Sequence, residues 1–280
     1  MIVNFTHHVD KAAHDEAYRG ALSRFVQFNS AGAFLRAYGA FDMVPFHQGG
    51  TTKGYVRGLA VRELVKAAEA SGRPFADTTV LDAGSGLGEL TTYLACLGFR
   101  VFGVDISEEA ARSGKRLAAI VGVQERARFL ANSLESMALP DASVDFVIGF
   151  AALHHFIKYP GVPDEFHRVM KPGALGFFAD AWGENRIFRL FHDRERMRRL
   201  GDVSLRRGMV RQYFRRFDVD LRPTDWFVML DKLLIRGLPR RVVRRLSRMH
   251  FALDRQIPDG NPLALTLAGA VRTRIRKPHA

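Results

Sequence analysis

Cysteine is nearly absent from the sequence, and long apolar segments are absent altogether. The 280 residues include one cysteine, Cys96, so a disulfide framework and a zinc site built on several cysteines are both excluded. Cys96 lies inside the apolar segment YLACLG, where we expect a buried thiol rather than a reactive one. No segment approaches the roughly 18 consecutive apolar residues of a membrane-spanning helix, and the first residues lack the pattern of a secretory signal. We therefore expect a cytoplasmic protein.

Acidic residues are scarce in the last third of the chain. Residues 1–182 contain 18 Lys and Arg against 19 Asp and Glu, whereas residues 183–280 contain 24 against 10. The last third therefore holds all of the excess behind the net charge of +13. A basic surface of this kind is either solvated or meets an anionic partner, such as lipid head groups, nucleic acid or a phosphorylated substrate.

Short apolar segments alternate with helical segments along most of the chain. Helices are predicted at 11–42, 55–72 and 107–122, the last with Ser107 as its N-cap, and a loop is predicted at 43–54. Strands are predicted at 79–83, 100–105, 145–150, 174–180, 216–223 and 268–278. Strands that are apolar throughout and alternate with helices indicate a mostly parallel sheet covered on both faces. The last strand instead alternates valine, threonine and isoleucine with arginines, as expected of a half-exposed edge strand.

The segment 82-DAGSGLG-88 follows the first predicted strand and carries a glycine at every second position. Glycines let the chain turn sharply and approach a ligand closely. A dinucleotide-binding turn would have the spacing G-x-G-x-x-G, with a phosphate at the helix N-terminus. Here the turn is followed by Glu89, which opposes a phosphate but tolerates a cation, and Asp105 ends the next strand, where a carboxylate can bind ribose hydroxyls. A cationic nucleoside without phosphates, S-adenosylmethionine, fits both acids.

Four segments together resemble class I S-adenosylmethionine-dependent methyltransferases of the small-molecule type. They are VLDAGSGLGE, FGVDIS, ESMALPDASVDFVIGFAALHHF and EFHRVMKPGALGFF, in the family's order over roughly residues 78–180. The resemblance implies an α/β, Rossmann-like fold with a mostly parallel seven-stranded sheet, helices on both faces, a helical N-terminal lid and a helical insertion before the last strand. The corresponding segments are a lid at 1–72, a cofactor-binding core at 73–223, a basic amphipathic insertion at 224–266, and the last strand and tail at 267–280.

The resemblance also implies which residues contact the cofactor. The methionine part would be lined by Asp82, Gly84, Gly86 and Gly88, the ribose would be held by Asp105, and the adenine would pack on Ile106. The family often places an acid beside the adenine amino group, whereas this chain has Asn132, Ser133 and Leu134 there. Phe150 and Ala151, at the end of the fourth strand of the family's core, would face the cofactor.

Acceptor chemistry is expected at the carboxyl ends of the strands, near His154, His155, Asp180 and Trp182. A histidine there can take a proton from a hydroxyl or an amine, which makes His154 and His155 the candidate catalytic residues. The alternative is that the histidine pair is a structural helix start, as it often is in the family. The earlier histidines, at positions 7, 8, 14 and 47, share no ligand spacing with a cysteine or an acid, and no metal is predicted.

The segment 240-RRVVRRLSRMHFAL-253 combines an apolar stripe with arginines. Val242, Leu246, Met249 and Leu253 share one helical stripe, and the arginines lie on its flanks and far side. The stripe either packs on the sheet or meets an anionic membrane surface or an amphiphilic substrate. RNA is a weaker candidate, because Trp226 precedes the arginines instead of alternating with them.

The predicted function is methyl transfer from S-adenosylmethionine to an O or N atom of a small or amphiphilic metabolite. Two alternatives stay open. One is displacement at the aminocarboxypropyl carbon of the same cofactor, which would release methylthioadenosine. The other is methylation of RNA, which predicts binding that weakens steeply with salt.

Overall fold

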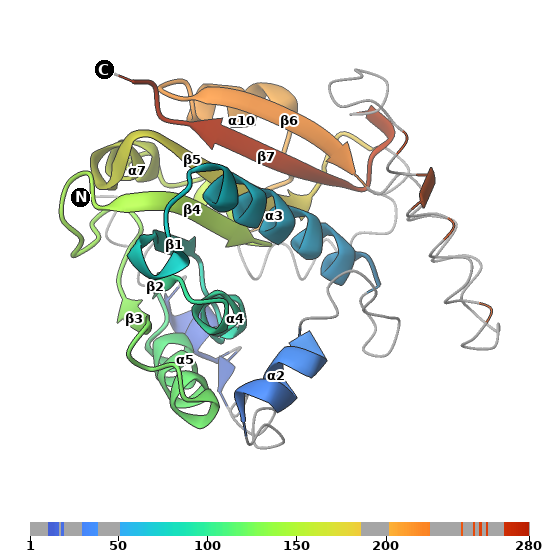
Figure 1. Ribbon diagram of the computed structural model, residues 1–280. Coiled ribbons are helices and arrows are strands. Elements are labelled where there is room, and N and C mark those ends of the chain that lie inside the picture. The colour runs from blue at the N-terminus through green and yellow to red at the C-terminus, as the bar shows by residue number, and fades with distance from the viewer. Residues whose placement is uncertain are drawn as a thin grey trace.

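A seven-stranded sheet forms the centre of the fold, with strand order β3-β2-β1-β4-β5-β7-β6 (Figure 1). The computed structural model describes residues 11–16, 18–19, 30–38, 51–185, 202–224, 242, 249, 252–253, 256 and 266–279. The strands are β1 (Thr79–Ala83), β2 (Arg100–Asp105), β3 (Ala127–Ala131), β4 (Val144–Phe150), β5 (Met170–Ala181), β6 (Asp218–Thr224) and β7 (Ala270–Arg276). The first five run parallel and β7 runs antiparallel to both neighbours, so the predicted mostly parallel sheet is confirmed.

Helices cover both faces of the sheet, as predicted. The helices are α2 (Ala31–Tyr38), α3 (Thr51–Ala70), α4 (Glu89–Cys96), α5 (Glu108–Val121), α6 (Leu153–Phe156), α7 (Val162–Val169) and α10 (Arg207–Tyr213), with a short 3-10 helix, η2, at Phe75–Asp77. One hydrophobic core lies between the sheet and α3, α4 and α5. A second core lies on the other face, where α6, α7 and α10 pack (Figure 1). The apolar residues of the central strands alternate between these two cores, which explains why the strands are apolar throughout.

Most of the predicted elements in the described range are found within a few residues of their expected bounds. Ser107 caps α5 as predicted, because its hydroxyl accepts a hydrogen bond from the backbone N–H of Ala110 at 3.1 Å. Strand β3 was not predicted, since it is a short edge strand with only alternate residues buried. The predicted loop at 43–54 is wrong over its last four residues, which form the first turn of α3.

The expectation that the last strand lies at the edge of the sheet is wrong, because β7 pairs with β5 on one side and β6 on the other. Its alternation is nevertheless present: Val271 and Ile275 are buried, while Arg272 and Arg274 emerge on the opposite face. Those arginines are tolerated inside the sheet because acidic partners cover them.

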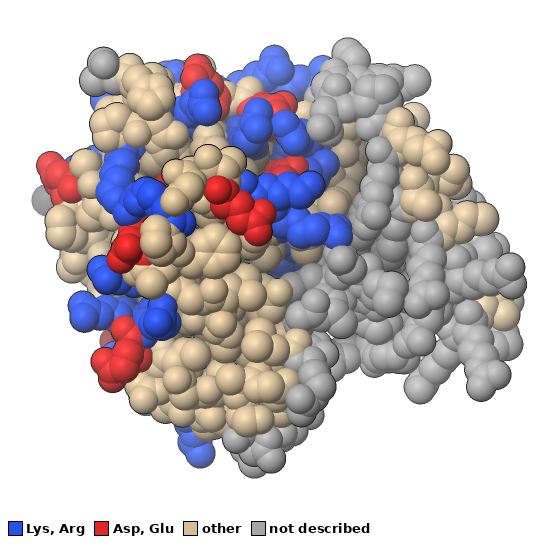
Figure 2. All heavy atoms as spheres, in the orientation of Figure 1, with Lys and Arg blue, Asp and Glu red and all other residues tan. Residues whose placement is uncertain are grey.

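Ion pairs neutralise much of the basic face formed by α3, β6 and β7. Arg222 and Arg272 both pair with Glu63 of α3, and Arg274 pairs with Asp220 of β6. Figure 2 accordingly shows acidic side chains lying among the Lys and Arg side chains on this side of the molecule. Part of the positive charge of the last third is therefore solvated and internally paired.

The segments expected as lid and insertion are described only in part. Helix α3, grouped with the lid, packs on the sheet against β4, β5 and β7. Most of the expected insertion at 224–266 lies outside the described residues, as do His7, His8 and His47. Across the described ranges, no helix combines the length and the apolar character needed to cross a membrane.

Cys96, at the end of α4, is half-buried rather than buried. It packs beside the small core of Phe34, Leu117 and Val121. Burial raises the pKa of the Cys96 thiol, which disfavours the reactive thiolate.

Gly88 sets the distance between α4 and α5. Its φ of 82° lies in the left-handed region, and it immediately precedes the first residue of α4. A Cβ atom at this position would lie 2.5 Å from the Cα of Gly114 in α5 and 2.6 Å from Cε1 of Phe129 in β3. The close approach of these elements therefore requires glycine at position 88.

We predict that Gly88→Ala destabilises the protein far more than Gly122→Ala. Gly122 has the same φ of 82°, but a Cβ atom there would meet nothing within 4 Å. The Gly122 variant should lose about 1–2 kcal/mol from the left-handed conformation alone, and the Gly88 variant a further 1–3 kcal/mol or so from overpacking. Urea unfolding followed by circular dichroism measures both losses. Equal losses would contradict the packing role of Gly88.

Candidate functional site

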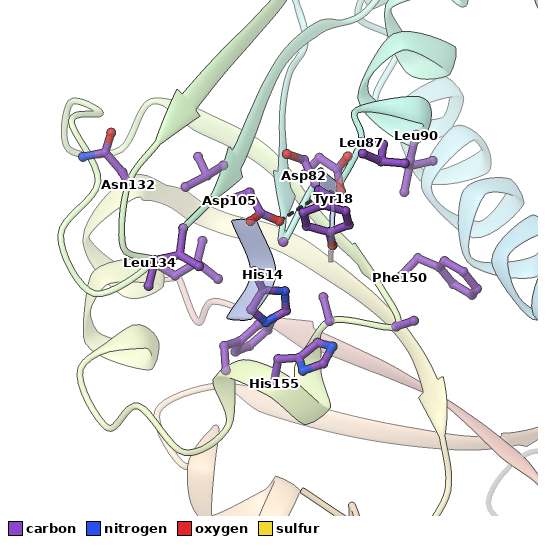
Figure 3. Close-up of a pocket in the computed structure, with 18 of the residues that line it drawn as sticks. His14, Tyr18, Asp82, Leu87, Leu90, Asp105, Asn132, Leu134, Phe150 and His155 are labelled. Atoms are coloured by element: carbon purple, nitrogen blue, oxygen red, sulfur yellow. Dashed lines mark hydrogen bonds between the residues drawn. The ribbon is translucent and has the colours of Figure 1, made fainter. Parts of the chain in front are cut away.

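The carboxyl ends of β1, β2 and β4 open into a cavity of about 300 Å³ (Figure 3). Strand order reverses at β1, which has β2 on one side and β4 on the other, and such a switch point leaves a crevice between the loops. The volume lies at the lower end of the range of ligand pockets, about 300–1,000 Å³. The lining residues come from the ends of these strands, the loop after β3, α3, α4, α6 and the N-terminal segment.

Asp105 joins the glycine turn to the end of β2. One carboxylate oxygen accepts the backbone N–H of Gly86 at 2.9 Å, and the other accepts the backbone N–H of Ser107 at 3.0 Å. Gly86 has a φ of 51°, in the left-handed region, and a Cβ atom there would lie 3.2 Å from the Tyr18 hydroxyl. Burial raises the pKa of the Asp105 carboxyl, although the two N–H bonds oppose this effect.

Asp82 lies deeper in the same cavity. Its carboxylate accepts a hydrogen bond from the Thr91 hydroxyl of α4 at 2.7 Å. Complete burial raises the pKa of Asp82 to about 7, because desolvation outweighs the Thr91 hydrogen bond. Asp82 and Asp105 together make this end of the cavity favourable for a cationic ligand.

The N-terminal helical segment at 11–16 is fastened to the start of α5. Asp15 accepts hydrogen bonds from the Ser107 hydroxyl at 2.5 Å and from the backbone N–H of Glu109 at 3.2 Å. Lys11 pairs with Glu108 on the same helix turn. This attachment places His14 and Tyr18 at the cavity, beside Asp105 (Figure 3).

Arg57 of α3 lines the cavity on the side of Phe150. Its guanidinium lies over the rings of Tyr38 and Phe150, 4.7 and 5.5 Å from their centroids, and donates a hydrogen bond to the Tyr38 hydroxyl at 3.5 Å. Burial raises the pKa of Tyr38, and Glu89 also favours its protonated form. Arg57 is thus a cation beside a cavity otherwise rich in acids.

The two candidate catalytic histidines are placed differently. His155 lines the cavity, and its Nδ1 lies 2.9 Å from a carboxylate oxygen of Asp202. His154 does not line it; its Nδ1 lies 2.6 Å from a carboxylate oxygen of Asp180. Only His155 can therefore face a molecule bound in the cavity.

All but two of the predicted cofactor-contacting and catalytic residues line the cavity, whereas Asp180 and Trp182, expected near the acceptor, lie outside its lining. Those that do are Asp82, Gly84, Gly86, Asp105, Ile106, Asn132, Ser133, Leu134, Phe150 and His155, and those that do not are Gly88 and His154. Arg57, Phe156 and Tyr159 also line it, although sequence patterns gave them no site role. The Ser133 hydroxyl accepts the backbone N–H of Glu135 at 3.1 Å, so it helps to hold the turn beside the cavity.

The polar groups that line the cavity suit S-adenosylmethionine. The Ser85 hydroxyl is buried at the cavity and has no hydrogen-bond partner in the described part of the chain, so it is available to a polar ligand atom. The glycine turn packs closely, since a Cβ atom at Gly84 would lie 2.7 Å from that of Ala152, and two buried acids, Asp82 and Asp105, line the same cavity. Asp105 would hold the ribose, and Asp82 would lie near the methionine part with its positive charge.

Sequence comparisons agree with this chemistry. The family model described as a methyltransferase domain matches residues 81–178. Sterol 24-C-methyltransferase of Eremothecium gossypii is 32% identical over 100 residues, which cover 34% of this chain and 26% of that protein. The 2-methyl-6-phytyl-1,4-hydroquinone methyltransferase of Synechocystis sp. is 33% identical over 108 residues, which cover 38% of this chain and 33% of that protein. The similarity therefore spans a third or less of each relative.

Solved structures share the fold. The YcgJ protein of Bacillus subtilis gives a TM-score of 0.54 at 20% identity, covering 80% of this chain and 100% of that one. Phosphoethanolamine N-methyltransferase 2 of Haemonchus contortus, in complex with phosphomonomethylethanolamine and S-adenosylhomocysteine, gives 0.55 at 14% identity, covering 94% and 60%. At these identities the likeness establishes the architecture alone.

The sheet and the cavity at its switch point are those of an α/β fold that binds a ligand at the carboxyl ends of its strands. Over the matched residues 81–178 the chain is similar to class I S-adenosylmethionine-dependent methyltransferases, whose cofactor is S-adenosylmethionine. The predicted family and cofactor are confirmed. The roles of the individual lining residues stay predictions.

We predict that S-adenosylmethionine binds more tightly as pH rises through 7. A bound cation favours ionised Asp82, so binding below pH 7 must expel the proton that burial retains. Each pH unit below 7 should weaken binding by up to about tenfold, and Asp82→Asn should flatten this dependence. Calorimetric titration at several pH values gives the slope, with the exposed Asp77→Asn as a control that keeps it. An unchanged slope in Asp82→Asn would contradict the assignment.

The raised pKa of Asp82 also makes the stability of the folded protein depend on pH. Between pH 4 and 7 the folded protein holds a proton on Asp82 that the unfolded chain has released. The proton on Asp82 therefore stabilises the folded state. This stabilisation is complete below the pKa of Asp82 in the unfolded chain, and it is lost as pH rises through the raised pKa in the folded protein.

Proposed function

We propose that the chain transfers the methyl group of S-adenosylmethionine to an O or N atom of a small, amphiphilic acceptor. The observation that carries the proposal is the position of His155, which lines the cofactor cavity together with Phe156 and Tyr159. This part of the wall combines a polar group that can act on a nucleophile with aromatic surface that can hold an apolar body. An acceptor with a polar head and an apolar remainder matches both.

S-adenosylmethionine supplies an activated methyl group, so the protein has mainly to align the acceptor and exclude water. Leu134, Phe150 and Phe156 provide apolar walls around the cavity. His14 packs edge-on against the ring of His155, with ring centroids 5.0 Å apart, and so closes this side of the cavity from the N-terminal segment. These contacts position and desolvate a bound acceptor.

The names of the relatives support a lipophilic acceptor. Two of them act, by name, on a sterol and on a phytyl hydroquinone, which are apolar molecules with one or two polar groups. The sterol enzymes methylate carbon, so the choice of an O or N atom rests on His155 and not on these relatives.

The product of the cofactor tests the reaction. We expect S-adenosylhomocysteine when the purified protein is incubated with S-adenosylmethionine and a panel of sterols, prenylated hydroquinones, phenols and amines. Mass spectrometry of the nucleosides and of the panel identifies the reaction and the acceptor. His155→Ala should lower the rate about 10²–10⁴-fold if this residue assists the nucleophile, and His279→Ala is the control outside the cavity.

Two other products would contradict the proposal in different ways. Methylthioadenosine would show displacement at the aminocarboxypropyl carbon. A methyl group found on carbon would leave the methyltransferase intact but refute the O or N assignment.

We also infer peripheral contact with an anionic membrane through the apolar stripe in 240–253. Val242, Met249 and Leu253 are exposed by 42%, 52% and 42%, so these three side chains do not pack into the core. The sequence surrounds them with arginines, five of which lie between positions 240 and 248. Exposed apolar side chains flanked by basic ones suit the interface of an anionic bilayer, where an amphiphilic acceptor would also reside.

Liposome flotation tests the membrane contact. We expect the protein to float with phosphatidylglycerol vesicles at low salt and much less with neutral vesicles. Met249→Asp and Leu253→Asp should each weaken binding about tenfold or more, because burying one such side chain is worth about 1.5–3 kcal/mol. Met209→Asp, at an exposed residue of α10, is the matched control. Absence of flotation at low salt, or retention of RNA instead, would contradict the inference.

A further inference from the structure

His154, His155 and Asp202 form a cluster beside the cofactor cavity. The two histidines are the second and third residues of α6, and Asp202 precedes α10. One potential ligand atom from each residue lies within 4.8 Å of those of the other two. Within the described part of the chain, this is the one group of three such side chains that could hold a metal ion. Two imidazoles and a carboxylate are a donor set typical of zinc and other divalent transition metals.

His154 is held in the manner of a metal ligand. Its Nδ1 lies 2.6 Å from a carboxylate oxygen of Asp180, the second-last residue of β5. Histidines that bind metals commonly donate one ring N–H to a carboxylate, which orients the ring and directs the other nitrogen to the metal. Asp180 is 3% exposed, and its second oxygen is buried with no hydrogen-bond partner among the residues described. Asp180 therefore serves as the orienting group and as an additional negative charge.

His155 and Asp202 face each other as two ligands of one ion would. The Nδ1 of His155 lies 2.9 Å from a carboxylate oxygen of Asp202. This nitrogen is buried, and no described residue forms a hydrogen bond with it, because the facing atoms are not aligned for one. Ligand atoms that each lie about 2.0–2.2 Å from a metal ion are separated by roughly 3 Å at ordinary coordination angles. The distance therefore suits coordination, whereas the alignment does not suit a hydrogen bond.

The cluster is also largely enclosed. The side chains of His154, His155 and Asp202 are only 19%, 26% and 14% exposed, and that of Asp180 is 1% exposed. Two carboxylates and two imidazoles thus lie together in one largely enclosed volume, and these groups are the usual donors to a divalent transition-metal ion.

The cluster lies between two cavities. A small cavity of about 80 Å³ is lined by His154 and Asp202, together with Trp182, Val203 and Ser204. Its volume exceeds the roughly 10–15 Å³ that one water molecule needs, so it has space for water beside the cluster. His155 belongs to the wall of the cofactor cavity. An ion held by the three residues would thus have space for a water ligand on one side and face the cofactor cavity on the other.

We propose that His154, His155 and Asp202 bind a divalent transition-metal ion, with Asp180 as the carboxylate that orients His154. The sequence prediction of no metal considered only the early histidines, and Asp202 is brought to the pair by folding. If the proposed methyltransferase function holds, the ion would bind an oxygen or nitrogen atom of the acceptor near the methyl donor. In that case His154 and His155 act as ligands rather than as proton acceptors.

Direct metal binding tests the proposal without any activity assay. Protein stripped with a chelator is titrated with Co²⁺ while the visible absorption is recorded, and Zn²⁺ retained after dialysis is measured by mass spectrometry. We expect one ion per chain. His155→Ala and Asp202→Asn should abolish this binding, and Asp180→Asn should weaken it about 10–100-fold.

Control variants separate the metal site from folding and from the cofactor site. His279→Ala removes an exposed histidine near the C-terminus and should bind the metal as the wild type does. Circular dichroism and S-adenosylmethionine titration on each variant report folding and cofactor binding separately. A wild-type protein that retains no metal would overturn the proposal, as would folded His155→Ala and Asp202→Asn variants that retain it fully. Failure of the methyl-transfer assay alone would refute the proposed function and leave the metal site standing.

Discussion

The carboxylate of Asp105 is the constraint on which the site depends. By accepting the backbone N–H groups of Gly86 and Ser107, it fastens the turn after β1 to the end of β2. Ser107 in turn caps α5, and its hydroxyl donates a hydrogen bond to Asp15 of the N-terminal segment. One buried acid thus connects the glycine turn, two helices and the wall of the cavity. A carboxylate so placed can bind hydroxyls only at a fixed position, which is what recognition of a ribose requires.

The rest of the cavity follows from the strand order. Because β1 lies between β2 and β4, the loops after these strands diverge and leave a crevice that the N-terminal segment partly covers. Asp82 and Asp105 give this crevice buried acidic groups, and Phe156 and Tyr159 give it aromatic surface. Both kinds of surface agree with the proposal of a cationic cofactor and an amphiphilic acceptor. In the proposed membrane contact, the exposed side chains of Val242, Met249 and Leu253 would bring the protein to the bilayer in which such an acceptor resides.

Sequence patterns predicted the parts of the protein that depend on local chemistry. The apolar strands, the glycine turn, the cap at Ser107 and the acid at Asp105 each have a local physical cause, and all were found where expected. Strand β3 was missed because a short edge strand has only half of its residues buried. The last strand was wrongly placed at the edge of the sheet. Its alternation of apolar residues and arginines is expected both for a half-exposed edge strand and for an inner strand whose arginines pair with acidic residues. Only the fold reveals that Glu63 and Asp220 cover its arginines.

The candidate site also contains residues whose positions sequence patterns could not predict. Asp202 carries no motif and is distant in sequence from the histidine pair, so its approach to His155 could not be predicted without the tertiary structure. The sequence likewise gave no signal that Arg57 lines the cavity, because it lies in a helix without a motif. Gly88 belongs to the glycine motif, yet it serves helix packing instead of lining the cavity. A motif thus predicts the type of site, while the contribution of each residue depends on where its backbone lies.

A crystal structure with S-adenosylhomocysteine shows directly whether Asp105 holds the ribose. We expect the nucleoside in the cavity between β1, β2 and β4, with both ribose hydroxyls within hydrogen-bond distance of the Asp105 carboxylate. We also expect the sulfur on the side of the cavity nearest His155. A nucleoside bound elsewhere, or a ribose without contact to Asp105, would refute the assignment of the cofactor site.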